Sequence, residues 1–165
     1  MGAKLAVAFA FLGSLPALAA EPSGCDKFKW PITSERAALN APDRPKVASG
    51  AEINAPAVNL ALLAPAAANL PASPERTPQD GTFAGFATLR TPPKPGTYTI
   101  SLSKAAWIDV VQGGKILRPK AFSGATDCDG IRKTMKHELA AQPFVVQVTG
   151  SKDDTVSLAV LPSAD

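Results

Sequence analysis

The stretch Thr97–Ser103, TYTISLS, alternates apolar and polar residues without a break. Side chains along a strand point alternately to its two faces, so Tyr98, Ile100 and Leu102 share one face and hydroxyl residues share the other. The segment TFAGFATLR has the same period, and one of its faces carries Phe83, Gly85, Ala87 and Leu89. This pattern predicts strands that bury one face, as in antiparallel sheets.

Two hairpins are predicted further along the chain. AWIDVVQ is followed by Gly113-Gly114 and KIL, and glycine supplies the positive φ that a tight turn requires. FVVQVTG is followed by a polar turn, SKDD, and then by TVSLAVLP. We expect six to eight strands between Thr82 and Leu161. The predicted fold class is mainly β, an antiparallel β-sandwich or jelly-roll-like domain over residues 82–165.

The preceding part, residues 21–81, is a proline-rich N-terminal arm, since twelve of the sixteen prolines lie between Pro22 and Pro95. ITSERAALNAP predicts one short helix, with Thr33 or Ser34 as its N-cap and Glu35 in its first turn. Residues 48–65 are compatible with one or two short strands or with a helix. Residues 65–81 lack a periodic apolar face, which predicts an extended linker or surface loop.

Residues 1–20 have the layout of a signal peptide, because Lys4 precedes an apolar run that ends in small residues. Cleavage is expected after Ala19 or Ala20, which predicts a periplasmic or secreted protein. No segment has the roughly 20 consecutive apolar residues of a membrane span. Without Lys4, sixteen basic and fourteen acidic residues remain. This small excess does not indicate a nucleic-acid partner.

The two cysteines, Cys25 and Cys128, are expected to form a disulfide in an oxidising compartment. The bond would tie the N-terminal arm to the domain. An alternative is a lipoprotein acylated at Cys25, although Pro22-Ser23-Gly24 is a poor lipobox.

The polar stretch TDCDGIRKTMKHEL, residues 126–139, raises the question of an active site. A metal centre is not expected, because the chain has one histidine and its two thiols pair with each other. Residues 131–139 suit a strand or a helix, and the β-rich neighbours favour a strand with His137 on its more apolar face. A lone histidine there indicates a packing residue rather than a catalyst. We therefore assign no catalytic residue and no cofactor.

Three residues are candidates for ligand binding: Trp107, Asp109 and His137. Trp107 and Asp109 share the mixed face of AWIDVVQ, and an aromatic beside an acid is common on sugar-binding surfaces. Alternatively, Trp107 fills the core of the sandwich. Trp30 is expected to pack the arm onto the sheet near the disulfide. The predicted function is noncatalytic binding of an envelope glycan or protein. The rivals are an enzyme using His137 with nearby acids, and an envelope assembly or inhibitor protein.

Three segments carry a family resemblance: CDKFKWPITSERAAL, GTYTISLSKAAWIDVVQGGKILRPKAFSG, and CDGIRKTMKHEL followed by QPFVVQVTG. They resemble small exported bacterial proteins of unknown function, some of which are labelled homogentisate 1,2-dioxygenase. Enzymes of that name hold iron through two histidines and a carboxylate, whereas this chain has only His137. The resemblance therefore implies export but not that activity. Parts of the chain are also similar to sandwich domains appended to secreted bacterial hydrolases, which bears on fold alone.

Overall fold

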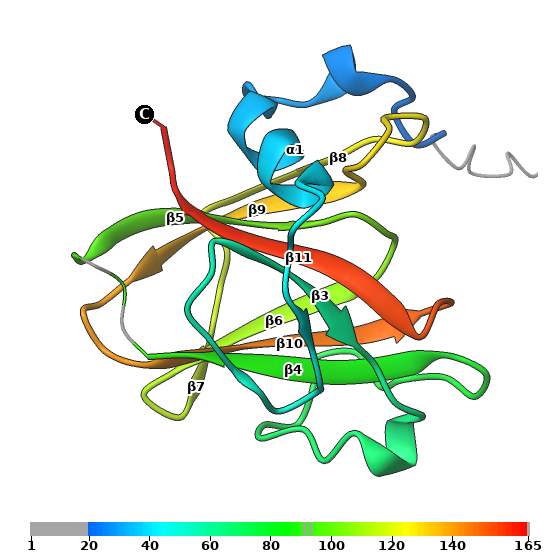
Figure 1. Cartoon of the computed structure of the whole chain (residues 1–165), viewed down its shortest axis with the longest axis vertical. Helices are drawn as coiled ribbons and strands as arrows, with labels where there is room; N and C mark the ends of the chain where they lie inside the picture. The colour runs from blue at the N-terminus through cyan, green and yellow to red at the C-terminus, as the bar shows by residue number, and fades with distance from the viewer. Residues whose placement is uncertain (1–19, 91, 93, 165) are drawn as a thin grey trace, which may run out of the picture.

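The computed structural model describes residues 20–90, 92 and 94–164 (Figure 1). The predicted signal peptide lies almost wholly outside these residues. The elements in the N-terminal half are η1 (Cys25–Lys27), α1 (Thr33–Asn40), β1 (Lys46–Val47), β2 (Glu52–Ile53), β3 (Ala57–Ala61) and η2 (Pro65–Ala67). The remaining strands are β4 (Phe83–Leu89), β5 (Gly96–Leu102), β6 (Trp107–Gln112), β7 (Lys115–Leu117), β8 (Ala121–Gly124), β9 (Lys133–Leu139), β10 (Phe144–Ser151) and β11 (Thr155–Pro162).

These strands form two packed sheets, which confirms the predicted sandwich-like, mainly β fold. The six-stranded sheet has the order β1-β3-β11-β5-β9-β8, and the five-stranded sheet has the order β2-β4-β10-β6-β7. Neighbouring strands are antiparallel, except that β1 pairs with β3, and β2 with β4, in parallel. The proline-rich half thus contributes strands to both sheets. Strands β4 to β11 match the six to eight expected after Thr82.

Local predictions within this part of the fold are also confirmed. The β6–β7 hairpin turns at Gly113 and Gly114, whose φ angles are 59° and 73°. Residues 133–139 form strand β9, which pairs with β5 and β8. The prediction that residues 131–139 form a strand rather than a helix is therefore confirmed. Residues 48–65, which were compatible with short strands or with a helix, contain strands β2 and β3.

The main core lies between the two sheets and contains the apolar face predicted for TYTISLS. Its fully buried side chains include Leu60, Ile100, Leu102, Val110, Val146, Val148 and Leu158. The polar face of β5 is buried too, because the N-terminal arm and α1 cover the outside of the six-stranded sheet (Figure 1). Thr99 Oγ1 donates to Glu35 Oε1 at 2.8 Å, and Ser101 Oγ donates to Thr134 Oγ1 at 2.9 Å. The expectation of a single buried face was therefore wrong for β5.

A second, smaller core joins the arm and α1 to the outer face of this sheet. It is built around the Cys25–Cys128 disulfide, which is present as predicted. Trp30 packs in the same cluster, as expected. The predicted helix is also present, but its N-cap is Ile32, without a side-chain cap, rather than Thr33 or Ser34. Ile32 is buried in the second core, so its packing determines where the helix begins.

A disulfide fits a protein outside the reducing cytoplasm. Within the described ranges, no helix has the length and apolar character needed to cross a membrane.

Candidate functional site

A groove of about 940 Å³ opens beside Trp107, where strand β6 begins. Its walls come from segments far apart in the sequence. They are the N-terminal residues 20–22, residues 76–79 of the proline-rich half, the loop between β5 and β6, the start of β9, and the end of β10. The groove therefore depends on the whole fold and not on any single motif.

Trp107 is held in a defined orientation at this groove. Its indole Nε1–H donates to Asp109 Oδ1 at 2.7 Å, and the Arg76 guanidinium lies 4.0 Å from the ring centroid. Lys133 Nζ lies 5.6 Å from the same centroid. A guanidinium stacked on an aromatic ring keeps its planar donors available to a carboxylate or phosphate. The arrangement thus presents a pre-oriented cation to an incoming ligand.

Asp109 lies beneath the groove rather than on its surface. It is 2% exposed, and its second oxygen, Oδ2, accepts the Glu75 backbone N–H at 3.2 Å. Burial raises the pKa of this carboxyl, and the hydrogen bonds from Trp107 and Glu75 oppose that shift. The structure thus brings two predicted ligand-binding residues together, with Asp109 positioning Trp107.

Asp109 also anchors the segment we call the strap, residues 69–80. Glu75 in the strap bonds to Asp109, and the Ala72 backbone N–H donates to Gln147 Oε1 at 2.8 Å. Two strand side chains thus accept backbone hydrogen bonds from a segment that lacks regular structure. Residues 65–67 of the predicted linker form η2, and the rest is an irregular loop with bends. The two hydrogen bonds place Arg76 of this loop against Trp107.

Lys133 also lines the groove. Its Nζ donates to the Ala106 carbonyl at 2.6 Å. Its pKa is lowered, first by burial and then by the positive charges of Arg132 and Arg76, while Glu21 acts in the opposite direction. Lys133 therefore lies among other cations, and this arrangement favours a ligand of opposite charge.

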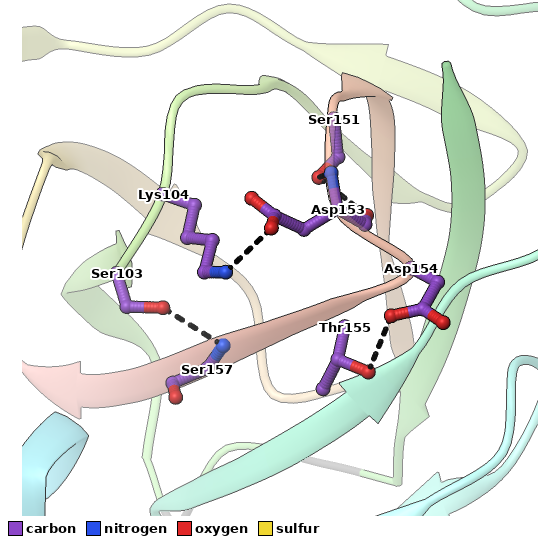
Figure 2. Close-up of polar contacts among 7 residues, drawn as sticks. All are labelled: Ser103, Lys104, Ser151, Asp153, Asp154, Thr155 and Ser157. Carbon is purple, nitrogen blue, oxygen red and sulfur yellow. Dashed lines mark hydrogen bonds and ion pairs between the residues drawn. The ribbon is translucent and has the colours of Figure 1, made fainter. Parts of the chain in front are cut away.

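Polar contacts join the β5–β6 loop to the β10–β11 turn and to strand β11 (Figure 2). Lys104 Nζ pairs with Asp153 at 2.8 Å, and the Ser157 backbone N–H donates to Ser103 Oγ at 3.0 Å (Figure 2). Neighbouring residues of the loop, of the end of β10 and of the turn line the groove: Ala105, Ala106, Gly150 and Lys152.

His137, the third predicted ligand-binding residue, lies away from this groove. It is 1% exposed, and it pairs across the sheet with Tyr98. Neither ring nitrogen has a hydrogen-bond partner among the described residues. Burial lowers the pKa of His137 to about 4, so the imidazole is neutral at pH 7.

The groove contains four basic residues that were not predicted from the sequence: Arg76, Arg132, Lys133 and Lys152. The sequence does contain one indication of an unusual basic residue, because Lys133 falls on the same strand face as Met135 and His137. A lysine on an apolar strand face indicates a special environment for its charge. Nothing in the local sequence around Arg76 indicates that it stacks on a tryptophan in a distant strand.

In the part of the chain that the structure describes, no three histidine, cysteine or acidic side chains cluster to hold a metal ion. Fold and site together define a disulfide-linked β-sandwich with a groove of cationic and aromatic character. The chain matches no protein-family model, no curated protein and no solved structure.

The role of Asp109 as the anchor of the strap can be tested by proteolysis. We expect Asp109→Ala to speed tryptic cleavage after Arg76 by about tenfold or more, because the Glu75 N–H and the Trp107 indole lose their shared acceptor. Cleavage after Lys136, in β9 between β5 and β8, requires the sheet to open and should change less. Asp154→Ala, which removes an exposed acid, is the matched control. Equal acceleration at both sites, or none at Arg76, would contradict this role.

Proposed function

We propose that the protein is an exported, noncatalytic binding protein that holds an anionic envelope component in the groove beside Trp107. The observation that carries the proposal is the Arg76–Trp107–Lys133 arrangement, in which two cations lie near one oriented aromatic ring. The four basic side chains that line the groove are accompanied there by one acid, Glu21, among the described residues. Local charge of one sign attracts ligands of the other.

The position of His137 supports binding over catalysis. A general acid or base must come within hydrogen-bond reach of its substrate, and His137 is enclosed in the core. The neighbouring acid Glu138 points to the opposite face of β9, where it is exposed and pairs with Lys120 at 2.5 Å. Asp109 is engaged by Trp107 and Glu75. These acids therefore do not converge on the imidazole.

The dioxygenase label is not supported by the residues present. An iron site of that type needs two imidazoles and a carboxylate on one cavity. The chain's single imidazole is buried between the sheets. We assign no step of any reaction to such an iron. A stoichiometric metal in the purified protein, or an activity abolished by His137→Leu, would favour the enzymatic alternative.

Retention of envelope material by the immobilised protein tests the proposal. Wild-type protein is expected to retain an anionic component from solubilised envelope fractions, and Trp107→Ala to weaken retention by about tenfold or more. Arg76→Gln, an exposed substitution, is expected to act in the same direction without affecting folding. Lys46→Gln removes an exposed charge from β1, at the other edge of the six-stranded sheet, and is the control.

Equal retention by wild type, Trp107→Ala and Arg76→Gln would contradict binding in this groove. Recovery of one protein partner at a different surface would favour the third class, an assembly or inhibitor protein.

A further inference from the structure

Three cations lie close to Trp107, and two of them have no ion-pair partner among the described residues. Arg76 stacks on the ring, Lys133 lies near the same ring, and Arg132 is next to Lys133 in the chain. Within the described part of the chain, neither Arg76 nor Lys133 forms an ion pair. Like charges in a partly desolvated site repel one another. A negatively charged group entering the groove would relieve this repulsion.

Glu21 already places one carboxylate in the groove. It forms an ion pair with Arg132, whose side chain is 21% exposed, whereas that of Glu21 is 66% exposed. The next residues are fixed by backbone bonds, from Thr126 N–H to Pro22 O and from Gly24 N–H to Thr126 O, each of 2.8 Å. The Glu21 side chain can therefore leave Arg132 while the chain after it stays in place. Arg132 thus binds a carboxylate that belongs to the same chain, that of Glu21.

The other walls of the groove have the chemistry that a sugar ring recognises. Phe122, which is 53% exposed, and Met135 supply apolar surface beside Trp107, whose ring is covered on one face by Arg76. Thr77 and Gln79, both exposed residues of the strap, supply hydroxyl and amide groups. A pyranose ring combines a C–H face, which packs on aromatic side chains, with hydroxyl groups that need hydrogen-bond partners.

We propose that the groove binds an acidic glycan, and that a uronate carboxylate of this glycan replaces the Glu21 carboxylate on Arg132. This inference rests on the proposed function, because it assigns a chemical class to the ligand of the same groove. Glu21 then acts as an internal competitor, which lowers the affinity for weakly charged ligands. Arg76, stacked on Trp107, is placed to bind a second carboxylate along the glycan.

Calorimetric titration at low ionic strength tests the proposal, with oligogalacturonate as the probe. Its fully methyl-esterified form has the same backbone without the charges. The acidic form is expected to bind about tenfold tighter or more, because charge-assisted hydrogen bonds are stronger than neutral ones. Arg132→Gln should weaken binding of the acidic form by about tenfold or more, for the same reason. Glu21→Gln should tighten it by about two- to fivefold, the range of an exposed ion pair.

Lys46→Gln is the control for loss of a positive charge, and it should leave the affinity unchanged. Lys152→Gln, an exposed change on the β10–β11 turn, should weaken binding even if Arg132→Gln fails to fold. Absence of oligogalacturonate binding, equal affinity for both forms, or an affinity unchanged in Arg132→Gln or Glu21→Gln would overturn the inference. Binding of poly-L-glutamate but not of oligogalacturonate would also overturn it, because the ligand would then be an acidic peptide. In that case groove-dependent retention would persist and the proposed function would stand.

Discussion

Replacing Cys25 and Cys128 together by serine is expected to lower the free energy of unfolding by about 4 to 5 kcal/mol. The bridge joins residues that are 103 positions apart. In the chain-entropy account, a cross-link of that span removes many conformations from the unfolded chain, so its loss stabilises the unfolded state. The bond also lies in the second core, where the arm packs on the sheet.

Urea denaturation of the oxidised wild type and of the double serine variant measures this difference. The wild type under strong reductant should behave like the variant, which separates the effect of the bond from that of the substitutions. Thiol labelling of the native, unreduced protein should detect no free cysteine. A difference below about 1 kcal/mol would show that the constraint on the unfolded chain contributes little.

Acidification is expected to destabilise the fold through His137 by about 3 kcal/mol between pH 7 and pH 4. Burial lowers the pKa of this imidazole in the folded state to about 4, below its ordinary value of 6.5. Protons therefore bind the unfolded chain first as the pH falls. Stability contributed by the neutral imidazole is present above pH 6.5 and is lost as the pH falls toward 4.

The test compares the pH dependence of unfolding in the wild type and in His137→Leu. Leucine removes the titrating group and both unpaired ring nitrogens, so we expect the variant to be about as stable as the wild type at pH 7 or more stable. Glu138, whose pKa is lowered mainly by a hydrogen bond from Lys120, contributes to both proteins alike. Parallel pH profiles for the two proteins would show that His137 is not the group responsible.

The strands could be predicted because their information is local. Period-two alternation in TYTISLS and the glycine pair after AWIDVVQ specify a strand and a turn from adjacent residues. The disulfide followed from the number of cysteines and the expected compartment. The parallel pairs β1–β3 and β2–β4 were not predicted, because two-residue strands carry no detectable period.

The groove could not be predicted, because its residues come from distant parts of the sequence. Arg76, Trp107 and Lys133 meet only after the strap has crossed the five-stranded sheet and the two sheets have packed. Glu35 shows the same limit, since its position in a first helical turn indicates an exposed acid, yet it is buried against Thr99. The contact between Trp107 and Asp109 could be predicted because one strand carries both residues, but their other partners come from elsewhere in the fold.

The central claim is that the groove beside Trp107 is the binding site, and the two indole N–H signals of the protein test it most directly. The chain has two tryptophans. Trp107 lines the groove, whereas Trp30 packs in the second core and serves as an internal control. During titration of ¹⁵N-labelled protein with the retained envelope component, the account predicts a saturable shift of the Trp107 signal and a constant Trp30 signal. Saturable binding that leaves the Trp107 signal unmoved would contradict the account.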